Sequence, residues 1–121
     1  MSKGLFIIGT GTDVGKTYAA GLILKTLCSA GLSAAYYKAA MSGNVRNTDG
    51  SLLPGDAICV KEVSGSPQPV EEMCPYVYEA ALSPHLAARL EYPCGCHPRY
   101  PCQLSSGCRV YRHYSDRKSV V

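Results

Sequence analysis

The nine residues GTGTDVGKT, at positions 9–17, limit what this chain can fold into more than any other feature. They end in Gly-Lys-Thr, as a phosphate-binding loop does, but the glycine that opens the pattern is Gly9, one position earlier than the common spacing. An apolar run precedes the loop and a helical pattern follows it, which is the setting that a phosphate-binding loop requires. The alternative is an ordinary strand-to-helix turn whose glycines only permit the bend.

The flanking residues predict a strand, a helix and a second strand. Residues 4–9 form a short apolar run bounded by glycine, which predicts a buried strand, and residues 33–38 predict another. Residues 16–30 predict a helix that ends at Gly31. Its apolar stripe follows helical spacing and consists of Ala20, Ile23, Leu24 and Leu27. A strand–helix–strand unit of this length implies a parallel sheet.

The later segments are shorter. Residues 39–55 are rich in Gly, Ser, Asn and Asp and predict a long loop, after which a helix starts near Asp56. Residues 65–72 predict a connector and residues 76–78 a strand. A final helix over residues 83–91 begins with Ser83 as its cap and a proline in its first turn. The expected fold class is α/β: a P-loop NTPase-type parallel sheet flanked by helices, incomplete on its C-terminal side.

Composition and charge divide the chain near residue 91. The sequence of 121 residues is 46% hydrophobic and 17% charged, as expected of one small globular domain, and it has no apolar run long enough to span a membrane. We expect a cytoplasmic protein. The whole net charge of +3 lies in residues 91–121, with five basic and two acidic residues. We therefore expect one folded region over residues 1–91 and an irregular tail over residues 92–121.

The tail has three possible interpretations. Its Cys, Pro, Arg and Tyr residues follow no helical or alternating period, which favours a frameshifted or foreign sequence. A zinc site is the second interpretation, although the spacing matches no paired knuckle. Its ligands would come from Cys94, Cys96, His97, Cys102 and Cys108. Nucleic-acid binding by the basic residues is the third, and we expect none because no regular element arrays them.

If the loop binds a nucleotide, its chemistry follows from its residue types. Backbone N–H groups and the positive end of the following helix would hold phosphate oxygens. Lys16 would reach the terminal phosphates, and the hydroxyl of Thr17 would ligate Mg²⁺. The carboxylate of Asp13 lies beside phosphate and is not expected to contact it directly.

Four stretches together resemble the dethiobiotin synthetases, over residues 1 to about 91. They are the loop itself, YYKAAMSG at 36–43, GDA at 55–57 and CPYVYEAALSPHLAARLE at 74–91. The resemblance implies that residues 1–91 are the N-terminal part of an ATP-binding synthetase domain. The chain departs from that family in having Ala39 where a proline is usual. It also lacks the family's downstream Glu-Gly-Ala-Gly-Gly segment. On this resemblance we expect the 121-residue chain to be inactive as it stands.

The resemblance implies an ATP- and Mg²⁺-dependent reaction that closes the ureido ring of 7,8-diaminononanoate with CO₂ through a phosphorylated carbamate. It implies a homodimer, Lys38 as the catalytic residue, Ser42 as a substrate contact, and Thr17 and Asp56 at the metal. The implied ATP-binding residues are Thr12, Asp13, Val14, Gly15, Lys16, Thr17, Tyr18 and Asp56. The simpler interpretations are a solvated lysine, a turn serine and a helix-start aspartate. Asp49 is the rival to Asp56, but it fits better as a turn residue beside Gly50.

Two rival functions remain. One is another P-loop ATPase, either related to the cobyrinic acid amidotransferases or of the partition type. The partition type carries a signature lysine at the position of Gly11, which counts against it. The other is a non-catalytic, truncated product.

Overall fold

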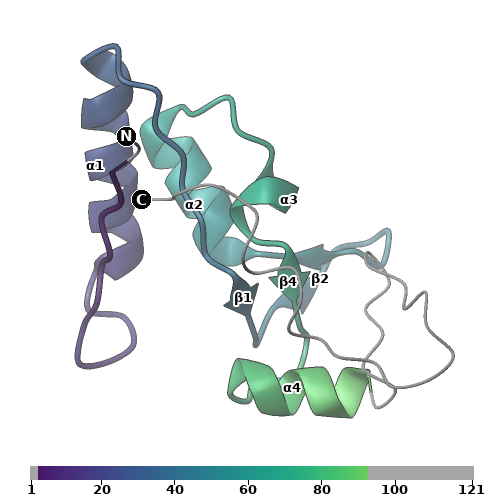
Figure 1. The fold of residues 1–121 in the computed structure, drawn as a ribbon. Coiled ribbons are helices and arrows are strands. Elements are labelled where there is room, and N and C mark those ends of the chain that lie inside the picture. Colours follow the sequence, from purple (N-terminus) through teal and green to yellow (C-terminus); the bar gives the residue numbers. More distant parts are fainter. Residues whose placement is uncertain (1–2, 93–121) are drawn as a thin grey trace, which may run out of the picture.

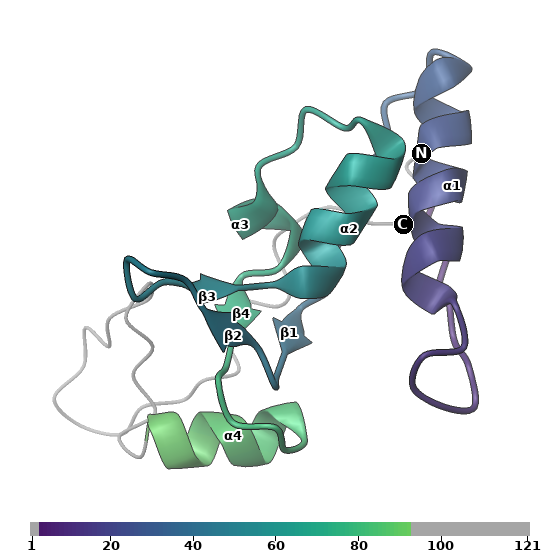
Figure 2. The same ribbon diagram turned by 180° about the vertical axis from the view of Figure 1, so that it is seen from behind.

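The protein is described by a computed structural model covering residues 3–92. Its described part is built from helices and very short strands (Figures 1 and 2). The helices are α1 (Lys16–Ser29), α2 (Gly55–Ser64), α3 (Val70–Met73) and α4 (Pro84–Glu91). The strands are β1 (Ala40–Met41), β2 (Val45–Arg46), β3 (Leu52–Leu53) and β4 (Tyr76–Val77). The three expectations about the residue 92–121 tail fall almost wholly outside the described residues.

Helix α1 confirms the sequence prediction and forms for local reasons. Gly15 stands before it with a left-handed backbone (φ 85°), and Gly31 follows it with φ 76°. At the C-terminal end, the Gly31 N–H donates to the Cys28 carbonyl (3.0 Å) and the Leu32 N–H to the Leu27 carbonyl (3.1 Å). These bonds satisfy carbonyls that the end of a helix otherwise leaves unpaired.

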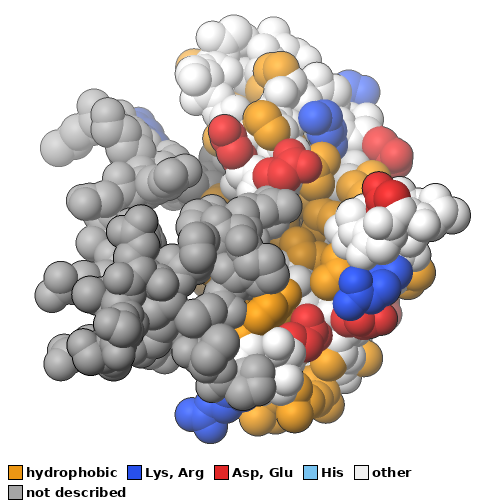
Figure 3. Space-filling view, turned by 90° about the vertical axis from the view of Figure 1, so that its right-hand side faces the viewer, with side chains coloured by type: hydrophobic (Ala, Val, Ile, Leu, Met, Phe, Trp, Pro, Cys, Tyr) orange, Lys and Arg blue, Asp and Glu red, His pale blue; other side chains and the backbone are white. Residues whose placement is uncertain are grey.

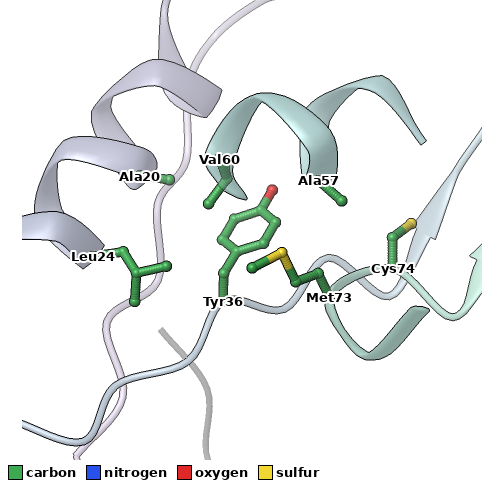
Figure 4. Close-up of a cluster of buried hydrophobic side chains, with 7 residues drawn as sticks. All are labelled: Ala20, Leu24, Tyr36, Ala57, Val60, Met73 and Cys74. Atoms are coloured by element: carbon green, nitrogen blue, oxygen red, sulfur yellow. The ribbon is translucent and has the colours of Figure 1, made fainter. Parts of the chain in front are cut away.

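The core lies between α1, α2 and the segment around α3. From α1, Ala20 and Leu24 are buried, and Ile23 and Leu27 are half-buried, so the predicted apolar stripe is the packed face. Figure 4 shows Tyr36 at the centre of the cluster, near Val60 of α2 and Met73 of α3. The remaining buried members are Ala57 and Cys74.

Helices α1 and α2 lie side by side in both views (Figures 1 and 2). Gly21 makes this approach possible: a Cβ at this position would lie 2.9 Å from both Cβ and Cγ1 of Val63. That separation is well below the usual 3.5–4.0 Å contact between carbon atoms. The glycine thus sets how closely the two helices pack.

Strand pairing confirms the α/β class. Strand β1 pairs in parallel with β4, with Ala40 opposite Tyr76 and Met41 opposite Val77. Strands β2 and β3 form a separate antiparallel hairpin. The predicted loop over residues 39–55 therefore contains β1 and this hairpin, and that part of the prediction is wrong. The helices predicted near Asp56 and over residues 83–91, and the strand near residue 76, are confirmed.

The strands predicted over residues 4–9 and 33–38 are not formed, and both predictions are wrong at those positions. Residues 3–9 run as an extended segment beside α1 (Figure 1), with Phe6 88% and Ile8 76% exposed. An extended apolar segment becomes a strand only when a neighbour supplies hydrogen bonds along its edge. Within residues 3–92 no segment does so for residues 4–9. For residues 33–38, side-chain and isolated backbone contacts replace a ladder.

Candidate functional site

The predicted phosphate-binding loop occupies residues 10–15, directly before α1. It consists of exposed bends, and Asp13 has a positive φ of 57° within it, the only described residue other than glycine to do so. A Cβ at Gly15 would meet nothing within 4 Å, so this glycine is required by its left-handed backbone rather than by crowding. The N–H groups of the first helical turn face this loop, which creates a partial positive charge suited to an anion.

Lys16 folds back across the loop. Its Nζ donates to the carbonyl oxygen of Gly11. A Cβ at Gly9 would lie 2.9 Å from Cδ of Lys16 and 3.1 Å from Cγ2 of Val14. The absence of a side chain at Gly9 therefore leaves room for the lysine stem, which gives a physical reason for a glycine at the shifted position.

The remaining residues of the loop and of the first turn of α1 differ in exposure. Thr17 is half-buried in the first turn of α1, whereas Val14 and Tyr18 are each 57% exposed. Thr12 and Asp13 are exposed in the loop itself. This arrangement suits the expected mode of binding, in which N–H groups rather than side chains hold phosphate.

Lys38 and Asp56 form an ion pair between Nζ and Oδ2. Lys38 ends the extended segment after α1, and its N–H donates to the carbonyl of Met73 (2.7 Å). Asp56 lies in the first turn of α2. The side chains are 39% and 28% exposed, so a ligand from solvent can reach both. The sequence singled out each residue separately but did not predict their contact.

Ser42 lies just beyond β1, where its hydroxyl donates to the carbonyl of Leu82. Leu82 belongs to the connector between β4 and α4, residues 78–83. The backbone next to Ser42 binds the same connector, because the N–H of Gly43 donates to the carbonyl of Ala80 (3.1 Å). Glu91, the last residue of α4, holds the connector from the other side: its Oε1 accepts from the N–H groups of Glu79 and Ala80, both at 2.8 Å. Glu91 was not singled out by the sequence.

Asp49 is a turn residue, as the sequence predicts. Its Oδ1 accepts hydrogen bonds from the N–H (2.8 Å) and the hydroxyl (2.6 Å) of Ser51. Hydrogen bonds to the charged form lower the pKa of the Asp49 carboxyl. His85 stands in the first turn of α4, with its Nδ1 3.2 Å from the hydroxyl of Ser83. Neither Asp49 nor His85 contacts the Lys38–Asp56 pair.

The structure assembles the predicted residues in three groups: the loop with Lys16 and Thr17, the Lys38–Asp56 pair, and Ser42 with its connector. In Figures 1 and 2 the loop lies at the N-terminal end of α1. This end of α1 points to the same side of the molecule as β1 and the start of α2. Among the hydrogen bonds and ion pairs of residues 3–92, none joins one group to another. The three groups are therefore separate sets of contacts on one side of the molecule rather than one bonded network.

A magnesium ion is compatible with these residues. The described part of the chain holds no cluster of three His, Cys, Asp or Glu side chains suited to a metal. Mg²⁺ at a nucleotide site needs no such cluster, because it takes most ligands from water and phosphate and only one or two from protein. The hydroxyl of Thr17 and the carboxylate of Asp56 are oxygen donors of the required kind, and Lys38 engages only Oδ2 of Asp56.

Charged side chains do not form one continuous surface on the hairpin side of the molecule. Figure 3 shows acidic and basic groups there interspersed with apolar ones. Arg46 is paired with Glu79, donating from Nε (2.8 Å) and Nη2 (2.6 Å) to the same carboxylate oxygen. Within residues 3–92 no helix is long and apolar enough to cross a membrane.

A family model described as an AAA domain matches residues 3–93. The chain belongs to this AAA domain family. The match includes the phosphate-binding loop, the Lys38–Asp56 pair, Ser42 and all four described helices. For an AAA domain, a glycine-rich loop that opens a helix is the expected position for nucleotide phosphates.

Three curated relatives of this AAA domain are named ATP-dependent dethiobiotin synthetase BioD. Those of Clostridium kluyveri and Clostridium perfringens are both 48% identical to this chain over 91 residues, and that of Clostridium novyi is 46% identical. Each alignment covers 75% of this chain but only 37–40% of the relative. The resemblance seen in the sequence is therefore confirmed, and the chain spans well under half the length of these relatives.

Proposed function

We propose that this chain supplies the nucleotide-binding part of an ATP- and Mg²⁺-dependent dethiobiotin synthetase. The observation that carries the proposal is the loop of residues 9–17, which opens α1 and is crossed by the Lys16 side chain. The names of the relatives and the Lys38–Asp56 pair support the same conclusion. The region responsible is residues 1–91, which agrees with the family match over residues 3–93.

The proposed reaction begins when an amine of 7,8-diaminononanoate adds to CO₂ and forms a carbamate. ATP transfers its γ-phosphoryl group to a carbamate oxygen, which leaves ADP. The second amine then attacks the carbonyl carbon, phosphate departs, and the ureido ring closes. ATP, the carbamate, the phosphorylated carbamate and the released phosphate all carry anionic oxygen, so the protein's main task is to position the reactants and to stabilise negative charge.

The described residues divide this task. The N–H groups of Thr12 to Thr17 hold phosphate oxygens, and Lys16 turns from the Gly11 carbonyl to the terminal phosphates. Lys38 stabilises charge on the carbamate and on the phosphoryl group in transfer. Thr17 and Asp56 hold Mg²⁺, which neutralises phosphate charge when bound. Ser42 contacts the diamine or its carbamate.

The same resemblance suggests the setting in which the protein works. We expect a cytoplasmic homodimer whose partners are small molecules. This proposal rests on residues 1–91 alone.

The first test measures nucleotide binding by the full chain. Mg-ATP at ten times its dissociation constant stabilises a one-site protein by about 1.4 kcal/mol, or roughly 6–11 °C in a domain of this size. Lys16→Ala should remove most of that shift. Lys25→Ala is the matched control, because Lys25 is an exposed lysine on the same helix, and it should retain the shift. A full shift in the Lys16→Ala variant would refute nucleotide binding at this loop.

The second test measures the reaction itself. Residues 1–91 would replace the aligned stretch of the Clostridium kluyveri relative, and the purified chimera would receive diaminononanoate, bicarbonate and Mg-ATP. Dethiobiotin formation, abolished by Lys38→Ala, would support the proposal. A folded chimera that binds ATP but makes no dethiobiotin would instead support another ATPase function.

A further inference from the structure

The side chain of Gln68 takes the place of a neighbouring strand at Tyr36. Its Oε1 accepts a hydrogen bond from the Tyr36 N–H (2.9 Å), and its Nε2 donates to the Tyr36 carbonyl (3.0 Å). One amide group thus satisfies both backbone groups of one residue, as a paired strand would. The two residues are 32 positions apart in the sequence, and the contact is partly buried.

Gln68 is itself held in place. Its own carbonyl accepts from Nζ of Lys61 (3.0 Å), at the end of α2. Its N–H donates to the hydroxyl of Ser66 (3.2 Å), which belongs to a buried residue. Two hydrogen bonds therefore hold the backbone of Gln68 in the connector between α2 and α3.

The backbone beyond Tyr36 leads directly to Lys38. After the Gln68 contact, the Lys38 N–H donates to the Met73 carbonyl, and the Ala39 carbonyl accepts from the Tyr76 N–H (3.2 Å). The parallel pairing of β1 with β4 follows at Ala40. Gln68 thus holds the chain two residues before Lys38, Met73 binds the N–H of Lys38 itself, and β4 holds the residues that follow.

The Lys38–Asp56 ion pair does not fix this geometry by itself. Both side chains are partly exposed, and ion pairs in such positions contribute about 1 kcal/mol or less. A lysine side chain also loses considerable conformational freedom when it is held in one position. The backbone of Lys38 sets the position from which its side chain reaches Asp56.

We propose that Gln68 is a positioning residue for Lys38: by pairing with the backbone of Tyr36, it aims the Lys38 side chain at Asp56. The catalytic importance of this role rests on the proposed function, whereas the geometric role does not. In this proposal Gln68 acts only through the chain that carries Lys38. A purely stabilising role is the alternative, and it predicts a lower melting temperature without any change in the Lys38–Asp56 pair.

The test uses the full chain with isotope-labelled lysine, and it observes the ε-methylene resonance of Lys38 by NMR. In the parent protein, Asp56→Asn should shift this resonance because it removes the paired charge. In a Gln68→Met background, Asp56→Asn should cause less than half of that shift, since Lys38 is no longer held against Asp56. Glu72→Met, at an exposed position of the neighbouring helix α3, is the matched control and should leave the full shift.

Hydrogen exchange gives a second readout. Loss of the Gln68 contacts should accelerate exchange of the Lys38 amide about tenfold, which corresponds to about 1.4 kcal/mol, while amides within α1 keep their protection. If Gln68→Met lowers the melting temperature but leaves the full Asp56→Asn shift, the proposal is wrong.

Gln68→Glu allows a decision if Gln68→Met does not fold. It preserves the acceptor for the Tyr36 N–H and removes the donor to the Tyr36 carbonyl. A reduced Asp56→Asn shift in this variant supports the proposal, and an unchanged shift overturns it. Failure of Lys38→Ala to affect dethiobiotin formation would refute the catalytic role of Lys38 and leave this geometric result standing.

Discussion

Gly21→Ala tests how closely α1 and α2 pack. The new methyl group would lie 2.9 Å from both Cβ and Cγ1 of Val63 and 3.6 Å from Cα of Val60. The first two separations are about 0.6–1.1 Å shorter than a normal carbon–carbon contact. Val63 is β-branched, and its Cβ is fixed to the backbone of α2, so a side-chain rotation cannot relieve the overlap. The two helices must move apart.

Two opposing terms determine the magnitude. Replacing glycine by alanine inside a helix contributes about 1 kcal/mol of stability, because the unfolded chain has less freedom to lose. Overpacking a helix interface costs roughly 1–3 kcal/mol. Since the overlap involves two atoms near the backbone, we expect the upper half of that range and a net loss of about 1–2 kcal/mol. For a domain of this size, the melting temperature should fall by roughly 4–16 °C.

Thermal and urea unfolding, followed by circular dichroism at 222 nm, would measure the change. Gly55→Ala is the matched control, because a Cβ there has only an ordinary 3.8 Å contact with Cε of Met41. Val63→Ala should remove the overlap with Cγ1 and keep the one with Cβ. The double variant should therefore recover part of the loss, about 0.5 kcal/mol relative to the sum of the single changes. If Gly21→Ala is as stable as Gly55→Ala, the described helix packing is wrong.

Three further predictions concern other parts of the site and its supports. Lys38→Ala should change the free energy of unfolding by about 1 kcal/mol or less, because the pair is partly exposed. The same substitution in the chimera should reduce dethiobiotin formation about 100-fold or more, and near-normal turnover would exclude a catalytic role. Burial, with a smaller contribution from the charge of Asp56, raises the pKa of Tyr36 from 10.0 to about 12. The unfolded chain therefore loses this proton at a lower pH than the folded chain, and the free energy of unfolding should fall as pH rises from about 10 to 12. In an alkaline titration, Tyr36→Phe should lessen that fall, whereas Tyr18→Phe, at an exposed position, should not. Glu91→Ala should lower the free energy of unfolding by about 1 kcal/mol and speed amide exchange at Ala80. Glu91→Gln keeps an acceptor oxygen and should lower it less; equal effects would show that Glu91 does not act through its hydrogen bonds to Glu79 and Ala80.

Helices and turns could be predicted because their causes are local. The stripe from Ala20 to Leu27, the glycines at both ends of α1, and the Ser-Pro start of α4 all lie within the elements they define. The Asp49 turn is equally local, since its side chain caps a residue two positions away. Each of these signals needs no knowledge of the rest of the fold.

Strands were predicted less well because pairing depends on a second, distant segment. Residues 4–9 have the apolar character of a buried strand, but in the described chain they find no partner and leave Phe6 and Ile8 exposed. Residues 33–38 are held at one point by a glutamine side chain instead of a ladder. The hairpin of β2 and β3 lies in a stretch whose Gly, Asn and Asp content indicates a loop. Local composition cannot distinguish these outcomes.

The candidate site divides in the same way. The residues expected to bind nucleotide or to act in the reaction could be chosen from the sequence, because Gly-Lys-Thr and the stretch around Lys38 are contiguous patterns. The residues that support them could not: Gln68 lies in a stretch that has the composition of a plain connector, and Glu91 has the pattern of a surface residue at the end of a helix. Both act by pairing a side chain with backbone groups far away in the sequence, and no spacing rule marks such contacts.

Substitutions at Lys16 and near Lys38 should differ in how far their effects reach. The side chain of Lys16 donates its hydrogen bond within its own loop, to the carbonyl of Gly11, so we expect its substitution to alter nucleotide binding and leave the fold intact. Lys38, in contrast, reaches Asp56 only because segments from three places in the chain meet: the residues after α1, the start of α2, and the connector that carries Gln68. A change at Gly21 or Gln68 can therefore weaken the Lys38–Asp56 pair without touching either residue. Loss of activity in such a variant identifies a chemical group only when the geometry of that pair is measured in the same protein.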